Sequence, residues 1–219
     1  MKRIRIYSIV IAGLLGVTGC ASVMATGEGT QQTSLPIPEK TRMVNLAWKP
    51  TMKKGDLDLA PLAAYTSISV EVVSITDIRE DVRVIGKTYE DRKVRKTLIP
   101  IATKTNVARW WKEAIERVFA ELGIRGSEKK EKLMLEIEIA DFSIFDDFTQ
   151  TGTSSLRINA HTPGDMMIWE GQISGASDLY VHATESDGIS ECLSNTAMVT
   201  VYNLFTDRSF RDAVIKAFE

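Results

Sequence analysis

The alternating stretch at residues 133–140 constrains the fold more than any other feature of the sequence. Every second side chain in it is a large aliphatic one, and the side chains between them are mostly charged or small. Successive side chains of a strand point to opposite faces, so this stretch predicts a strand with one buried and one solvated face. The core is therefore expected on one side of a sheet that contains this strand.

Two more alternating stretches follow, at 156–160 and 167–173, and turn-forming residues stand before each of them. Short polar connections between alternating stretches favour antiparallel neighbours. We therefore predict a three-stranded antiparallel meander over residues 132–176, in which Gly171 is a candidate bulge.

Apolar residues recur at helical spacing in three other segments. The first predicted helix begins after Asn106, a suitable N-cap, and ends at Gly123, where a left-handed residue is wanted. A second helix, capped by Asp187, runs to Leu204, and a short third one covers 210–217. Extended segments are predicted at 44–48, 68–73, 84–86 and 93–101. This order favours a single α+β domain with a mainly antiparallel sheet and helices packed on one face.

The N-terminus has the layout of a secretory signal peptide. Three basic side chains within the first five residues precede an uncharged, apolar run at residues 6–17, which is too short to span a bilayer. The run ends in Val17-Thr18-Gly19-Cys20, which resembles the bacterial lipobox. That resemblance implies that Cys20 is lipidated and begins the mature chain. The alternative is an ordinary signal peptide with a chance cysteine.

These features divide the chain into three parts. We predict a lipoprotein signal peptide at 1–19, a lipidated cysteine with a flexible tether at 20–43, and the α+β domain at 44–219. The tether is rich in Gly, Ser, Thr and Gln and shows no hydrophobic period. Ala21, rather than an aspartate, follows the cysteine, and this favours the periplasmic side of the outer membrane.

Charge indicates how the mature chain meets its surroundings. Loss of residues 1–19 leaves 24 of the 27 basic residues against 29 acidic ones, a net charge of −5. A mildly acidic chain has no general attraction for nucleic acid or for anionic lipid headgroups. Membrane contact is therefore expected through the N-terminal lipid, and no nucleic-acid partner is expected.

Few residues are candidates for reactive chemistry. Cys192 stands without a Cys-x-x-Cys motif, so we predict a buried, reduced, structural thiol. The two histidines, His161 and His182, lack the spacing of a zinc site and are expected to be solvated or hydrogen-bonded. We predict no metal and no cofactor.

Three aspartates and a tryptophan pair have two interpretations each. Asp141, Asp146 and Asp147 are expected to be solvated turn formers; the alternative is an acid–base pair or a Ca²⁺ site. Trp110 and Trp111 point about 100° apart on a helix. One is expected in the core, and Trp110 is a candidate partner contact if it lies on an exposed patch.

One pattern resembles a known family. A hydrophobic strand, then Asp77-x-Arg79 and Ile85-Gly86, a helix that ends at Gly123 and a terminal segment at 205–218 are similar to the YajG-type lipoproteins of Gram-negative bacteria. The resemblance covers residues 66–219 and implies an anchored α+β envelope domain without established chemistry. Independently, Asp77 and Arg79 are expected to fold the chain back through an Asx-type bond and a charge-assisted hydrogen bond, with Gly86 at positive φ.

The sequence thus favours a non-enzymatic, lipid-anchored lipoprotein that binds a protein or lipid-linked partner in the envelope. One alternative is a hydrolase of an envelope polymer, which needs a deep pocket with two carboxylates about 5 to 9 Å apart. A second is an auxiliary lipoprotein of an ABC-type lipid transporter, for which a continuous apolar groove between helix and sheet is expected.

Overall fold

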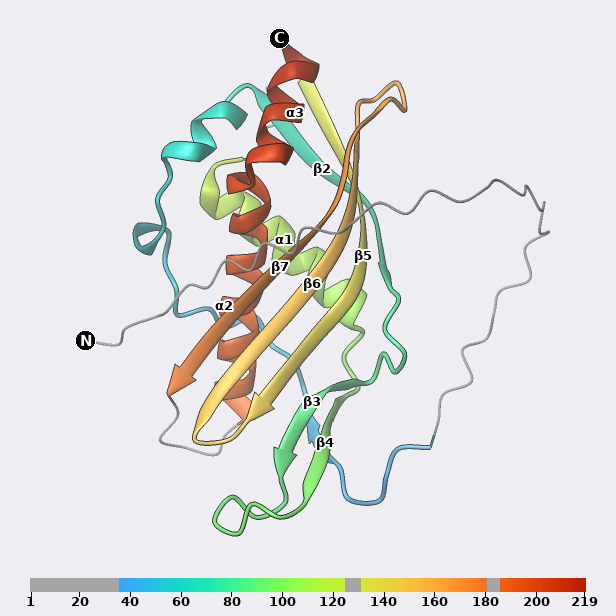
Figure 1. The fold of residues 1–219 in the computed structure, drawn as a ribbon, viewed down its shortest axis with the longest axis vertical. Coiled ribbons are helices and arrows are strands. Elements are labelled where there is room, and N and C mark those ends of the chain that lie inside the picture. The colour runs from blue at the N-terminus through green and yellow to red at the C-terminus, as the bar shows by residue number, and fades with distance from the viewer. Residues whose placement is uncertain (1–35, 125–130, 181–185) are drawn as a thin grey trace, which may run out of the picture.

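The computed structural model describes residues 36–124, 131–180 and 186–219. Within these residues it contains a seven-stranded sheet, three α-helices and two short 3-10 helices (Figure 1). In chain order the elements are β1 (Arg42–Val44), η1 (Lys54–Asp56), η2 (Ala60–Tyr65), β2 (Ile68–Asp77), β3 (Val84–Tyr89), β4 (Leu98–Thr103), α1 (Val107–Leu122), β5 (Glu131–Asp146), β6 (Thr149–His161), β7 (Met167–Tyr180), α2 (Ser186–Thr206) and α3 (Arg208–Phe218).

The sheet is organised around β5. Its strand order is β1-β4-β3-β5-β6-β7, and β2 also pairs with β5. The pairs β5–β6 and β6–β7 are antiparallel and form the predicted meander. The β3–β4 pair is antiparallel as well. In contrast, β2 and β3 both run parallel to β5, and β1 runs parallel to β4. The α+β class is therefore confirmed, with a sheet whose pairings are mixed.

A bulge at Ala140 divides β5 into two halves. Ile139 pairs with Leu156 and Asp141 pairs with Ser155, so Ala140 is the extra residue. Such a residue shifts the alternation, and Phe142, Ile144 and Asp146 become the buried positions after it. Gly171, the predicted bulge, instead pairs regularly with Ile158, and the irregularity of β6–β7 lies between Ala160 and His161.

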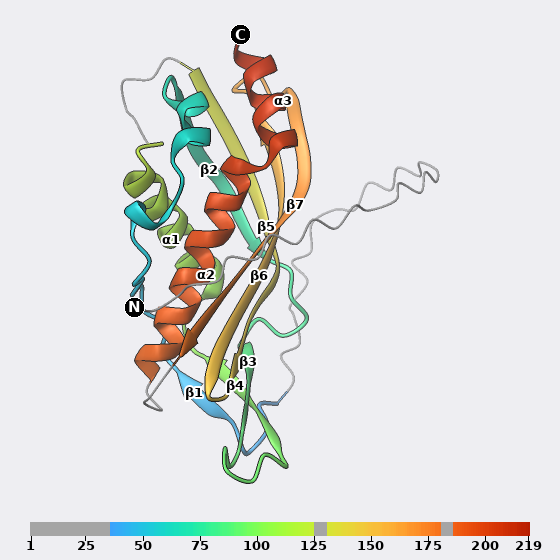
Figure 2. The same cartoon turned by 60° about the vertical axis from the view of Figure 1, so that its left-hand side comes forward.

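The helices cover one face of the long strands. Figures 1 and 2 show α1 and α2 on the same side of β5, β6 and β7. Here Phe205 of α2 contacts Tyr65, with ring centroids 4.9 Å apart, and α3 places Phe210 5.1 Å from the Trp169 ring of β7. The predicted caps of α1 are confirmed, because the Asn106 side chain accepts from the Arg109 N–H and Gly123 has φ 75°.

The contact between α2 and the sheet is unusually polar. Ser154 and Thr200 hydroxyls lie 2.6 Å apart, and those of Ser177 and Thr196 lie 2.8 Å apart. These side chains are buried, and their hydroxyls satisfy one another. A Cβ on Gly175 would lie 2.1 Å from the Thr200 Oγ1, so the helix approaches the sheet because this position has no side chain.

Residues 46–52, which we call the N-terminal strap, lie against the side of α2 that faces away from the sheet. Backbone N–H groups of Lys49 and Met52 donate to the side chains of Ser194 and Asn195, each at 3.0 Å. The strand predicted at 44–48 is wrong in position, because β1 ends at Val44. The residues that follow bond to side chains of α2 and not to another strand. Similarly, Asp187 lies in the first turn of α2, which begins at Ser186.

We predict that Gly175→Ala destabilises the protein by about 1 to 3 kcal/mol, because the new methyl group would overpack the α2–sheet contact. Its Cβ would also lie 2.7 Å from the Thr200 backbone nitrogen, which a rotamer change does not relieve. Gly55→Ala is the control, since nothing lies within 4 Å of its added Cβ. Urea unfolding followed by tryptophan fluorescence measures both variants. Equal stabilities would contradict the close approach.

Candidate functional site

The predicted Asp77–Arg79 pair is present and buried. Arg79 donates from Nε to Asp77 Oδ1 at 2.8 Å and from Nη2 to Asp77 Oδ2 at 2.6 Å. The Arg79 backbone N–H also donates to Asp77 Oδ1 at 3.3 Å, which is the expected Asx-type bond. Both side chains are less than a tenth exposed, at 8% and 9%.

Arg79 also joins the two strands that share one side of β5. Its remaining N–H groups donate to the carbonyls of Val82, Val84 and Phe142 at 2.8, 2.8 and 3.1 Å. All five guanidinium donors therefore have acceptors. Pairing with β2 ends at Ile139 and pairing with β3 begins at Ile144, so the Phe142 carbonyl lies in the gap between them. Arg79 fills that gap.

Gly86 allows β3 to reach β5 beside this gap. Gly86 pairs with Ile144 and has φ 150°, as the predicted positive φ requires. A Cβ on Gly86 would lie 2.0 Å from the Ile144 carbonyl oxygen. Asp77, Arg79 and Gly86 thus form one structural unit at the junction of β2, β3 and β5.

A hollow of about 600 Å³ lies on the sheet surface next to this unit. Its lining combines apolar side chains of β3 and β5 with the charged side chains of Glu80, Lys87 and Asp141. Asp141 accepts from the Thr153 hydroxyl at 3.0 Å, and the Ser143 and Thr153 hydroxyls lie 2.9 Å apart. A second hollow, of about 690 Å³, lies farther along the same face and is lined by acidic and amide side chains with Arg157.

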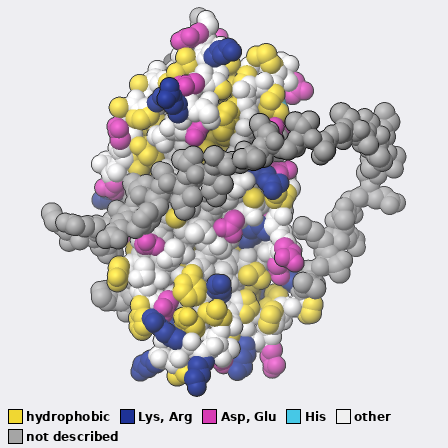
Figure 3. All heavy atoms as spheres, viewed as in Figure 1, with side chains coloured by type: hydrophobic (Ala, Val, Ile, Leu, Met, Phe, Trp, Pro, Cys, Tyr) yellow, Lys and Arg dark blue, Asp and Glu magenta, His cyan; other side chains and the backbone are white. Residues whose placement is uncertain are grey.

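In and beside the hollows, the outer sheet face carries polar side chains that form hydrogen bonds with one another. Thr151 donates to Asp178 at 2.8 Å, and Ser155 accepts from Gln172 at 2.7 Å and from Ser174 at 3.2 Å. Figure 3 shows Lys and Arg side chains gathered at the lower end of this face. We call this surface the polar face; the three α-helices of the described residues lie on the other side of the sheet.

Asp146 is a buried anchor, contrary to the prediction of a solvated bend. Its side chain is fully buried, with Arg42 and the Nη2 of Arg92, at 2.5 Å, bound to Oδ2. Gln150 donates to Oδ1 at 2.8 Å, and Thr88 donates to the Asp146 carbonyl at 2.7 Å. The carboxylate therefore connects β1, the β3–β4 hairpin and the end of the meander.

The three aspartates do not converge as an acid–base pair. Asp141 lies on the polar face, Asp146 points to the inner side, and Asp147 pairs with Arg95 at 2.8 Å. Within the described residues, no group of three or more His, Cys, Asp and Glu side chains is placed to hold a metal ion. His161 is mostly buried, 3.5 Å from Glu136; His182 and Cys20 lie outside the described residues.

The prediction that Trp110 is an exposed partner contact is wrong. Its side chain is 6% exposed, and its ring lies 5.2 Å from Phe142 and 6.0 Å from Trp48. Phe142 points inward because of the bulge, and Trp48 comes from the strap, so neither neighbour follows from the helical pattern of α1. Both tryptophans are core residues.

Cys192 is buried as predicted. Its side chain has no exposed surface, and its Sγ donates to the Gln150 carbonyl at 3.5 Å. Burial raises the pKa of this thiol to about 12, against the smaller opposing effect of the hydrogen bond with Ser177. A neutral, enclosed thiol of this kind is a poor nucleophile at neutral pH.

Comparisons with known proteins give distant likenesses. No family model matches the sequence, and no curated protein matches it. A Xanthomonas campestris protein of the DUF330 family has 9% identity and a TM-score of 0.46, over 82% of this chain and 98% of that one. A candidate lipoprotein from Caulobacter crescentus has 7% identity and a TM-score of 0.39, over 72% and 94%. Lipoprotein GNA1162 from Neisseria meningitidis has 11% identity and a TM-score of 0.20, over 53% and 90%.

Likenesses of this size transfer no activity or partner to the chain. The resemblance to YajG-type lipoproteins stays a prediction.

We predict that Asp77→Asn destabilises the protein by about 3 to 5 kcal/mol, because it leaves the Arg79 charge buried without its counter-ion. The matched control is Glu113→Gln, which breaks an exposed ion pair with Arg109 and is expected to cost less than about 0.5 kcal/mol. Urea unfolding curves give both free energies. Similar losses for the two variants would show that the Asp77–Arg79 pair has no special structural role.

Proposed function

We propose that this protein is a lipid-anchored lipoprotein on the periplasmic side of the outer membrane, and that its domain binds an envelope protein without catalysing a reaction. The anchor rests on the lipobox-like sequence that ends at Cys20. No helix of the described residues is long and apolar enough to cross a membrane. In this proposal the diacylglyceryl group, usually with a further acyl chain, supplies stable attachment.

The polar face is the observation that carries the binding role. Three long strands form a platform with hollows on it, and the helices of the described residues lie on its other side. The hydroxyl and amide groups on the platform are already placed by their mutual hydrogen bonds. A preorganised surface of this kind loses little side-chain entropy when a protein binds.

Two observations bear on the alternatives. A cavity of about 10 Å³ among the apolar side chains of α1, α2 and the sheet is too small for the lipid chain that a transporter auxiliary protein would shelter. A hydrolase would need two carboxylates in one hollow, such as Asp141 and Glu80 in the first or Glu138 and Glu170 in the second. If Asp141→Asn abolishes cleavage of an envelope polymer by the purified protein, the binding proposal is wrong.

We predict that Cys20→Ser abolishes incorporation of a palmitate analogue in cells. The thiol of Cys20 is the expected acceptor of the diacylglyceryl group, and a serine hydroxyl cannot replace it. Cys192→Ser is the matched control and should keep full labelling, because Cys192 is buried in the domain. Labelled protein in the Cys20 variant would exclude lipidation at this position.

We also predict that photo-crosslinking is specific to the polar face. A photoreactive phenylalanine analogue at Ser155 is expected to yield a discrete crosslinked protein in intact cells. The same analogue at Lys112, which is exposed on α1 on the other side of the sheet, is the control and should yield none. Adding Thr153→Arg, which places a large charged side chain on the polar face, should abolish the crosslinked product formed from position 155. Crosslinks that are equal at 155 and 112 would contradict a binding role for this face.

A further inference from the structure

The end of the β3–β4 hairpin has a charge opposite to that of the whole chain. Residues 87–97, which we call the basic tip, contain five basic side chains and two acidic ones, a net charge of +3. The complete sequence has a net charge of −2. The average charge therefore hides a local positive surface.

The carboxylates around the basic tip are already engaged. Asp146 is held by two arginines, Asp147 pairs with Arg95, and Glu90 pairs with Lys40 at 2.7 Å. Asp91 accepts the backbone N–H groups of the turn, from Lys93 at 2.7 Å and from Val94 at 3.2 Å.

Three lysines of the tip, Lys87, Lys93 and Lys96, are exposed and form no ion pair within the described residues. They are therefore available to an anionic partner.

Large apolar side chains are exposed on the tip and next to it. Val94 and Leu98 are 54% and 46% exposed, and Phe148, in the neighbouring β5–β6 turn, is 57% exposed. The Arg95 guanidinium lies 4.6 Å from the centre of the Phe148 ring. Basic side chains mixed with aliphatic and aromatic ones are typical of surfaces that enter the headgroup region of a bilayer.

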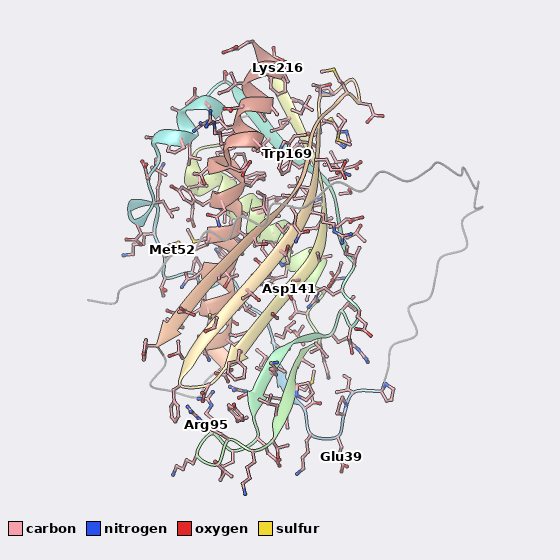
Figure 4. The ribbon with its side chains drawn as sticks, in the orientation of Figure 1. Glu39, Met52, Arg95, Asp141, Trp169 and Lys216 are labelled. Atoms are coloured by element: carbon pink, nitrogen blue, oxygen red, sulfur yellow. The ribbon has the colours of Figure 1, made fainter. Side chains whose placement is uncertain are left out.

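The chain enters the domain at the same end. Figure 4 shows Glu39 and Arg95 at one end of the molecule and Lys216 at the other. Lys40 contacts Glu90 of the tip, and β1 pairs with β4 of the hairpin. Pro36 is the sixteenth residue after Cys20, and a fully extended chain of sixteen residue steps spans at most about 55 Å. A lipid on Cys20 would thus keep this end of the domain close to the bilayer.

We propose that the basic tip makes a second, reversible contact with the membrane, by binding anionic phospholipid headgroups. This inference rests on the proposed lipid anchor. Each lysine near an anionic surface contributes a modest attraction, which the anchor makes effective by keeping the tip at high local concentration. With both contacts formed, the hairpin end faces the bilayer and the β6–β7 turn points away from it.

The test uses the lipidated protein reconstituted in vesicles of phosphatidylcholine alone, or with phosphatidylglycerol added. A spin label is attached at Val94→Cys and, as matched control, at Met166→Cys in the β6–β7 turn, which is 56% exposed. Cys192 is buried and should not react. Collision with oxygen and with a water-soluble nickel complex reports whether each label is in lipid or in water.

On anionic vesicles the label at 94 should enter the headgroup region, while the label at 166 stays in water. Lys93→Gln with Lys96→Gln should lower the ratio of docked to undocked tip about 25-fold, about fivefold for each charge removed. A label at 94 that remains as accessible to nickel as the label at 166 would overturn the proposal, as would equal docking on vesicles without anionic lipid.

Flotation separates this proposal from the anchor. Protein that floats with phosphatidylcholine vesicles, but whose tip stays in water on anionic ones, retains the anchor and refutes the tip contact. If the protein does not float with phosphatidylcholine vesicles, the proposed anchor is wrong, and the tip contact is then tested by flotation with anionic vesicles. Flotation of the unmodified protein that is lost in the Lys93→Gln, Lys96→Gln variant supports the tip contact. No flotation of the unmodified protein with anionic vesicles refutes it. Tip residues protected by an acidic protein instead of by lipid would also refute it.

Discussion

The guanidinium of Arg79 is the interaction on which the arrangement of the sheet depends. Two parallel strands, β2 and β3, use successive parts of one side of β5, and the change of partner would leave the Phe142 carbonyl unpaired. A buried peptide group without a hydrogen-bond partner is costly, so such a change of strand needs a donor at that point. Arg79 supplies it, binds the loop carbonyls as well, and has its charge balanced by Asp77.

Asp146 connects the meander to β1 and to the β3–β4 hairpin at the end of the molecule. Its carboxylate faces inward only because the Ala140 bulge shifts the alternation of β5, and there it binds Arg42 of β1 and Arg92 of the hairpin. Breaking a buried pair by removing one partner is far more costly than losing an exposed pair. β1 and the β3–β4 hairpin are therefore fixed relative to the polar face.

Local patterns predicted those parts of the fold that depend on neighbours in sequence. The meander, the caps of α1 and the Asp77–Arg79 pair follow from alternation, helical period and a two-residue spacing. The parallel pairing of β2 and β3 with β5 depends on distant segments and leaves no local mark. The bulge at Ala140 is equally hidden, and it explains both errors of site prediction: it buries Asp146, and it turns Phe142 toward Trp110. The polar contact of α2 was missed because this helix was predicted from its apolar spacing alone.

Net charge is a weak guide to what a folded surface attracts, and the basic tip shows why. Acidic residues occur along the whole described part of this chain, while three exposed lysines are concentrated in the hairpin segment 87–96. Screening limits exposed charges to a range of about 8 Å at physiological ionic strength, so a bilayer at that end responds to the tip and hardly to the distant carboxylates. An anchored domain needs only such a local field to be oriented. In the proposed arrangement the long strands stand away from the membrane, and the polar face remains open to a partner.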